Sequence, residues 1–223
     1  MKKWLKNHPH IWVACYALIY GPWFYLLEQH VTENFYILHC SLDDKIPFVE
    51  YFIIPYTLWF FYVGTAFVYF FFRANRREFY QMTGFLFTGM TLFLIISTFF
   101  PNGLALRPDV FPRENVCTEM VRHLYHVDTP TNVLPSIHVY NTLGVMIAVN
   151  TCERLQNHRV VKLCSNALGI LIVLSTLFLK QHSVIDVTAG LFMAAGFYLL
   201  FYYLPERKRL PDSKTDYARK NYN

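Results

Sequence analysis

The sequence predicts an all-α fold, a bundle of six transmembrane helices with both termini in the cytoplasm, and three observations support this. Of the 223 residues, 54% are hydrophobic and only 16% are charged, whereas soluble domains carry about 25% charged residues. Six stretches come near the roughly 20 apolar residues that a spanning helix needs. Basic residues alternate between rich and poor connections. The composition excludes a disordered chain, a collagen-like repeat and a basic nucleic-acid module.

The six apolar stretches are separated by polar connections. Their approximate bounds are 11–27, 52–72, 82–100, 139–152, 163–179 and 184–204. The first follows three lysines, as a signal peptide would, but no small-residue cleavage pattern ends it, so we interpret it as a retained span. The fourth has about 14 residues, and it spans only if the polar residues beside it continue the helix.

The positive charges predict the orientation. Fifteen of the 20 Lys and Arg lie before the first stretch, in the connections 73–81 and 153–162, and after residue 204. Because connections rich in Lys and Arg stay in the cytoplasm, both termini are predicted to be cytoplasmic. We therefore expect one integral membrane domain over residues 1–204, followed by a basic, disordered cytoplasmic tail over 205–223.

Two longer acidic loops, residues 28–51 and 101–138, are predicted to face the other side of the membrane. Four apolar residues of the second loop recur at helical spacing: Val116, Met120, Leu124 and Val127. They favour a short interfacial helix, and a solvated linker is the alternative. Cys40 and Cys117 lie one in each loop, where an oxidising compartment would permit a disulfide; free thiols are the alternative.

Three polar groups lie at this far-side surface, where ionisable residues beside apolar spans are candidates for function. They are Arg107-Pro108, Pro135-Ser136-Ile137-His138, and Lys180-Gln181-His182 followed by Asp186. Each group alone is common in purely structural roles, so their order and their shared membrane face carry the argument.

The spacing of the third group suggests its chemistry. His182 and Asp186 are four residues apart and share one helix face. Such a carboxylate holds an imidazole in one tautomer and stabilises positive charge on it, as a histidine nucleophile attacking phosphorus requires. His138 could then protonate the leaving oxygen as a general acid. Arg107, with Ser136 and Lys180, could hold phosphate oxygens.

These residues resemble the three motifs of the type 2 phosphatidic acid phosphatase superfamily, KxxxxxxRP, PSGH and SRxxxxxHxxxD, which lie on a six-helix membrane core. The resemblance covers about residues 50–204, the predicted catalytic core. It implies a reaction through a phosphohistidine, without a metal or other cofactor, with His182 as nucleophile, Asp186 as its orienting carboxylate and His138 as general acid. It also implies that Arg107 and Ser136 hold the phosphate.

The chain departs from these motifs at three positions. Phe100 stands where the first motif has lysine, Thr176 where the third has arginine, and Ile137 where the second has glycine. Two cations of the phosphate site are therefore missing, and three other cations could replace them: Lys180, Arg113 and Arg122. A reduced motif set is similar to the branch that includes inositol phosphorylceramide synthases and sphingomyelin synthases, which transfer a phospho-head group between lipids.

The leading prediction is an integral membrane lipid phosphatase that acts at the extracytoplasmic surface. Its partners would be the bilayer and a lipid phosphate or phospholipid substrate, with no nucleic acid. One alternative is a phosphotransferase that moves a phospho-head group to a lipid hydroxyl, since losing two cations suits a phosphodiester. The further alternative is a catalytically inactive membrane protein that binds or transports lipid.

Overall fold

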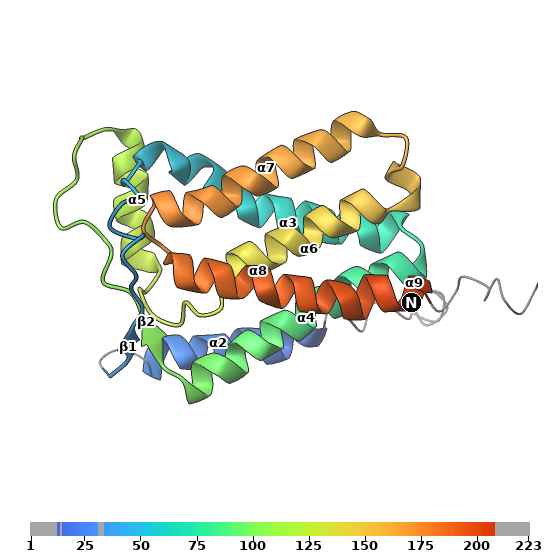
Figure 1. Cartoon of the computed structure of the whole chain (residues 1–223), viewed down its shortest axis with the longest axis horizontal. Helices are drawn as coiled ribbons and strands as arrows, with labels where there is room; N and C mark the ends of the chain where they lie inside the picture. The colour runs from blue at the N-terminus through green and yellow to red at the C-terminus, as the bar shows by residue number, and fades with distance from the viewer. Residues whose placement is uncertain (1–12, 14, 31–33, 208–223) are drawn as a thin grey trace, which may run out of the picture.

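Long helices dominate the computed structural model, which describes residues 13, 15–30 and 34–207. The helices are α2 (Ala17–His30), α3 (Ile53–Arg73), α4 (Arg76–Phe99), α5 (Val116–Val127), α6 (Ile137–Thr151), α7 (Arg159–Phe178), α8 (Val184–Tyr198) and α9 (Leu204–Arg207). Short turns of other helix types are η2 (Glu50–Phe52), η3 (Glu153–Leu155) and the π-helical η4 (Leu199–Tyr203). Figure 1 shows the longer helices running lengthwise, with α5 crossing one end of the bundle.

Four helices of the described chain are long and apolar enough to cross a membrane. They are Glu50–Arg73, Arg76–Phe99, Arg159–Phe178 and Val184–Arg207. These match the second, third, fifth and sixth predicted stretches. Large apolar side chains point outward from them, such as Phe192, which is 75% exposed, and this surface suits a lipid environment.

The other two predicted spans correspond to shorter helices, α2 with 14 residues and α6 with 15. The polar residues flanking α6 do not extend it, because Ser136 and Cys152 both have extended backbones. The count of six spans and the orientation therefore stay predictions. The first lysines and residues 208–223 lie outside the described residues, and the helix that begins with α8 continues through α9 to Arg207, past the predicted start of the tail.

Helix α6 packs closely against its neighbours α4 and α8. A Cβ added at Gly89 of α4 would lie 2.1 Å from the ring of Tyr140, whose hydroxyl donates to the carbonyl oxygen of Phe85 over 2.6 Å. A Cβ added at Gly190 of α8 would lie 2.9 Å from the carbonyl oxygen of Ser136. Both glycines therefore let helix backbones approach, and the second brings the start of α6 against α8.

The two acidic loops contain more structure than the sequence predicts. The helix predicted around Val116 is confirmed as α5. Strands β1 (Tyr36–Ile37) and β2 (Asn102–Gly103), which were not predicted, join the two loops as a parallel pair. The Asn102 side chain accepts from the backbone N–H groups of Val133 and Leu134, which fixes the approach to α6. Cys40 and Cys117 are free thiols in this structure.

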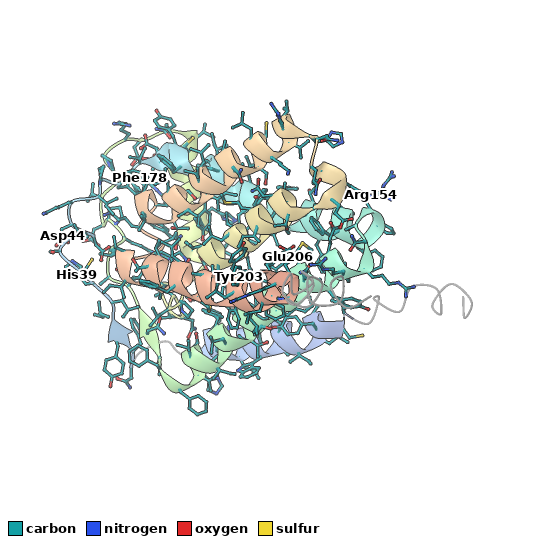
Figure 2. All side chains as sticks on the ribbon, turned by 45° about the vertical axis from the view of Figure 1, so that its right-hand side comes forward. His39, Asp44, Arg154, Phe178, Tyr203 and Glu206 are labelled. Atoms are coloured by element: carbon teal, nitrogen blue, oxygen red, sulfur yellow. The ribbon has the colours of Figure 1, made fainter. Side chains whose placement is uncertain are left out.

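Every predicted site residue lies at one end of the bundle. The C-terminal ends of α2, α4 and α7 lie at this end together with the starts of α3, α6 and α8 (Figure 1). Figure 2 shows His39 and Asp44 of the first loop at the same end, with Arg154 at the other. We call it the site end.

Candidate active site

His182 and Asp186 form a buried pair at the start of α8. Their Nδ1 and Oδ2 atoms are 2.5 Å apart, and Asp186 is fully buried. An aspartate carboxylate only accepts hydrogen bonds, so Nδ1 of His182 carries the hydrogen. The other ring nitrogen, Nε2, is then left with a free lone pair in the neutral ring. The carboxylate thus holds the ring in the tautomer that a nucleophilic Nε2 of His182 would require.

His138, in the first turn of α6, meets that lone pair. Its Nδ1 lies 3.3 Å from Nε2 of His182. Since Nε2 carries no hydrogen in this tautomer, Nδ1 of His138 is the donor. The two histidines therefore place a ring nitrogen with a lone pair and an N–H donor face to face, and their roles as nucleophile and general acid stay predictions.

Two aromatic residues of α3 hold the His138 ring. The Tyr56 ring stacks on it with centroids 4.9 Å apart, and the Trp59 ring lies 4.3 Å away. Neither contact could be predicted from the sequence, because both residues lie in an apolar run that looks like any other span. Together they restrict the orientations of the imidazole.

Ser136 connects the second motif to the third. Its side-chain oxygen caps α6 by accepting from the N–H of Val139, and its own N–H donates to the carbonyl oxygen of Asp186 over 3.1 Å. The side chain is fully buried beside the close approach at Gly190. Ser136 thus holds the two histidine segments in register, and its contact with phosphate stays a prediction.

Arg107 binds Gln181, the residue that precedes His182 in the chain. Its Nη2 donates to Oε1 of Gln181 over 2.9 Å and its Nη1 to the carbonyl oxygen of Tyr125 over 3.0 Å. Burial lowers the pKa of the Arg107 guanidinium, and the charge of Asp128 opposes that effect. Arg107 therefore lies beside the residue next to His182, and its contact with phosphate stays a prediction.

Lys180 is bound to the first loop in this structure. Its Nζ donates to the carbonyl oxygens of Asp43 over 2.7 Å and Ile46 over 2.5 Å. Burial lowers the pKa of the Lys180 ammonium, and the charges of Asp43 and Asp44 oppose it. Two of its three N–H groups are thus engaged with backbone, so its predicted role in holding phosphate is untested and it serves here to anchor the loop.

The residues at the positions that depart from the motifs are uncharged, so they do not replace the missing cations. Phe100 stacks on Tyr36 with centroids 4.9 Å apart. The Thr176 hydroxyl donates within its own helix, while its carbonyl oxygen accepts from the backbone N–H groups of Gln181 and His182. Thr176 therefore supports the backbone at His182. The two remaining candidates form ion pairs elsewhere, Arg113 with Glu50 and Arg122 with Glu114 and Glu119.

Asp43, which the sequence did not single out, anchors the start of α8. Its carboxylate accepts from the N–H of Val184, the hydroxyl of Ser183 and the N–H of Cys40, each over 2.7–2.8 Å. Burial acts to raise the pKa of the Asp43 carboxyl, but these hydrogen bonds outweigh it and lower the pKa below its usual value. Asp43 thus fixes the residues that follow His182.

A small cavity of about 40 Å³ opens beside the two histidines. Its lining residues are Phe24, Glu28, Phe93, Asp128, Thr129, Thr131, Asn132, Val133, Ile137, His138, Gln181 and His182. None of these is Lys or Arg, and two are carboxylates. Burial raises the pKa of the Asp128 carboxyl, with the charges of Arg107 and His182 opposing it. The space next to the two histidines is therefore acidic and rich in hydrogen-bonding groups.

Comparison with known proteins supports the family that the motifs indicated. A family model of the PAP2 superfamily matches residues 82–210, more than half of the chain. The match includes all three motif groups and leaves α2 and α3 outside it. No curated protein and no solved structure matches the chain.

Proposed function

The chain belongs to the PAP2 superfamily of membrane phosphatases and phosphotransferases, and on that basis we propose that it cleaves a lipid phosphoester through a phosphohistidine intermediate at the extracytoplasmic surface. The observation that supports this best is the arrangement of three side chains. Asp186 orients His182, and Nε2 of His182 faces Nδ1 of His138 over 3.3 Å.

In the first step, Nε2 of His182 attacks phosphorus and the bond from phosphorus to the leaving oxygen breaks. His138 enters this step as the imidazolium, gives its Nδ1 proton to that oxygen and becomes neutral, while Asp186 stabilises the positive charge that forms on the His182 ring. The two rings touch in this structure, so the substrate must separate them to place phosphorus between the nucleophile and the acid. The product of this step is a phosphohistidine and a free alcohol.

In the second step, His138 takes a proton from water, whose oxygen attacks phosphorus and displaces Nε2 of His182. The bond from phosphorus to nitrogen breaks, and the enzyme returns to its starting state. If the attacking group is an organic hydroxyl instead of water, the same step transfers the phosphoryl group.

The charges around the site favour a second candidate, transfer of a phospho-head group. A phosphomonoester dianion brings more negative charge than a phosphodiester, and a site that contains Asp186, Asp128 and Glu28 repels it more. The two motif cations that would offset this repulsion are absent. A phosphodiester lipid is therefore the donor that suits the site better.

The test is turnover of phosphatidic acid and phosphatidylglycerol by purified protein in detergent, without added metal. We expect release of phosphate or head group, and we expect His182→Ala to lower the rate by roughly 10⁴-fold or more, because the nucleophile is lost.

The matched control is His39→Ala. His39 also contacts a carboxylate, Asp44, over 2.8 Å, but on the surface. This variant should keep wild-type turnover. Equal rates in the wild type and the His182 variant would overturn the proposal.

A further inference from the structure

We propose that the groove between α4 and α8 holds one acyl chain of the lipid substrate, and that Gly196 limits the length of the chain that fits. This inference rests on the proposed function, because it concerns the apolar part of the substrate whose phosphate reaches the histidines. It is based on the shape of the groove, on its position beside the candidate active site and on its length.

The groove lies on the side of the bundle, where α4 and α8 diverge. The two helices are close at the end opposite the site, where a Cβ added at Gly84 of α4 would lie 2.7 Å from the ring of Phe201. Towards the site end they separate, and the segment before α6 lies between them (Figure 1). The space between them has a volume of about 530 Å³ and a lining that is almost entirely apolar. The diverging helices therefore leave an apolar groove in the part of the chain that the structure describes.

Three segments form the walls of this groove. The approach to α6 contributes Leu134 and Pro135, α4 contributes Leu92 and Ile96, and the rest come from α8 and η4: Ala189, Phe192, Met193, Gly196, Phe197 and Leu200. Phe192 is 75% exposed and Leu200 is 52% exposed, so the groove is open on the outside of the bundle. Both helices that border it are candidate membrane spans, so the open side is expected to face lipid.

The site end of the groove adjoins the candidate active site. Pro135 is buried and directly precedes Ser136, whose N–H donates to the carbonyl oxygen of Asp186 over 3.1 Å. On the opposite wall, Ala189 directly precedes Gly190, where a Cβ would lie 2.9 Å from the carbonyl oxygen of Ser136. The groove therefore begins at the contact that holds the two histidine segments together.

The groove and the small cavity beside the histidines are lined by adjacent residues of the same two segments. Val133 lines the cavity and Leu134 lines the groove, while on α4 Phe93 lines the cavity and Leu92 lines the groove. A lipid whose phosphate reaches the histidines can therefore place a chain in the groove by crossing a single segment of the protein.

The length of the groove matches the depth of one bilayer leaflet. Ala189 and Leu200 are eleven positions apart, which corresponds to about 16 Å along a helix. Half of the hydrocarbon core of a bilayer is about 15 Å. A chain that starts beside Pro135, at the predicted membrane surface, would therefore follow the groove to the middle of the bilayer.

The cross-section of the groove favours a single acyl chain over a helix of a second copy. Spread over its length, the volume gives a mean cross-section of about 33 Å². An α-helix has a diameter of about 10 Å with its side chains and needs more than twice that area. An acyl chain is a single file of CH₂ groups, so it fits where a helix does not.

Gly196 lies where it can limit the length of the bound chain. It is seven positions beyond Ala189, or about 10 Å further from the site. A Cβ added at Gly196 would have no atom of the described residues within 4 Å. A large side chain can therefore be placed there without disturbing the packing of α8, and it would fill the far part of the groove.

The experiment measures kcat/KM of purified full-length protein in detergent for two chain lengths. The substrates are dipalmitoyl and dihexanoyl phosphatidic acid, with the phosphatidylglycerols of the same chains as a second pair. We expect Gly196→Phe to lower kcat/KM about tenfold for the palmitoyl lipids, because it adds volume to a space that the chain occupies. The hexanoyl chains are less than half as long and end before Gly196, so their kcat/KM should stay at the wild-type value.

The matched control is Gly64→Phe. A Cβ added at Gly64 of α3 also has no atom of the described residues within 4 Å, and Gly64 does not line the groove. This variant should keep the wild-type ratio of palmitoyl to hexanoyl kcat/KM. If Gly196→Phe does not fold, Leu200→Trp fills the same end of the groove from an exposed position.

A second measurement detects the chain itself and does not depend on turnover. Phosphatidic acid with a photoreactive diazirine at the end of one acyl chain is mixed with the protein and irradiated, and mass spectrometry maps the labelled residues. We expect the label on residues 92–96 of α4 and 193–200 of α8 and η4. Unlabelled dipalmitoyl phosphatidic acid should compete for these positions, and Gly196→Phe should lose most of the label.

The outcomes separate the two proposals. Cleavage with equal palmitoyl-to-hexanoyl ratios in Gly196→Phe and Gly64→Phe would overturn the groove and leave the proposed function standing. Label spread evenly over the outside of the bundle would do the same, since it would show ordinary bilayer contact. A dimer that Gly196→Phe dissociates without changing the chain preference would assign the groove to a second copy and overturn the inference. No cleavage of any of these lipids by folded wild-type protein would overturn the proposed function and this inference together.

Discussion

The two ends of the bundle each bury a carboxylate in the first turn of a helix, and they use it differently. At the end opposite the site, Glu78 of α4 forms a capping box with Asn75 and accepts from the N–H of Glu153 over 2.7 Å. Its oxygens are bound to backbone N–H groups and to the Cys152 thiol. Glu78 therefore ties the start of α4 to the end of α6.

At the site end, Asp186 of α8 binds an imidazole instead. Its Oδ2 meets Nδ1 of His182, a group that can change its charge during a reaction. At this end, Ser183 and Asp43 cap the start of α8 by accepting from its backbone N–H groups. The comparison indicates that burial at a helix start does not by itself give a carboxylate a catalytic role. The group that the carboxylate binds determines whether it can have one.

The largest expected difference between these two carboxylates is a loss of activity when Asp186 is neutralised. Asp186→Asn keeps the size of the side chain but removes the charge that selects the His182 tautomer and stabilises the imidazolium. We expect turnover to fall about 10²–10⁴-fold, with a small change in thermal stability. A steady-state assay and a thermal unfolding curve of the same sample measure both. Wild-type turnover in this variant would remove the distinction between the two ends.

The converse variant, Glu78→Gln, should affect stability and leave activity intact. The amide has one acceptor oxygen where the carboxylate has two, so at least one buried N–H loses its partner. This costs about 1–3 kcal/mol. We expect a lower unfolding temperature and unchanged turnover per folded molecule below it. A loss of turnover as large as that of Asp186→Asn would show that the opposite end is coupled to the chemistry.

A smaller effect depends on pH and concerns Asp43. The hydrogen bonds that lower its pKa in the folded protein are absent in the unfolded chain, so its carboxylate contributes stability above about pH 4. That contribution is lost as pH falls through the lowered pKa. Thermal unfolding between pH 3 and pH 6 should therefore show a steeper acid loss in the wild type than in Asp43→Asn. Parallel curves would contradict the account of how α8 is anchored.

Hydropathy predicted the long helices, and motif spacing predicted three side chains that the fold brings together, whose catalytic roles stay a proposal. Four spans follow from apolar runs alone, and His138, His182 and Asp186 follow from residue types at fixed intervals within them. The family resemblance is confirmed by the match over residues 82–210. The resemblance to the transferase branch stays a prediction.

Hydropathy and motif spacing could not predict contacts between segments that are distant in the chain. Glu28 meets Asn132 across 104 positions of the chain, and Lys180 meets Asp43 across 137. The predicted role of Lys180 in holding phosphate stays untested, and the sequence could not predict the backbone carbonyl oxygens that the fold places around its ammonium. Gln181 could not be singled out from the sequence, because an uncharged amide gives no signal until its neighbours are known.

The central claim is a covalent phosphorus bond to His182, and trapping it is the most direct test. Radiolabelled phosphatidic acid is mixed with enzyme and quenched in alkali during turnover, because phosphohistidine is stable in alkali and labile in acid. The account predicts label on the protein, mapped by mass spectrometry to His182, that disappears in acid and is absent from His182→Ala. Turnover without labelled protein at any quench time, or label that persists in His182→Ala, would contradict it.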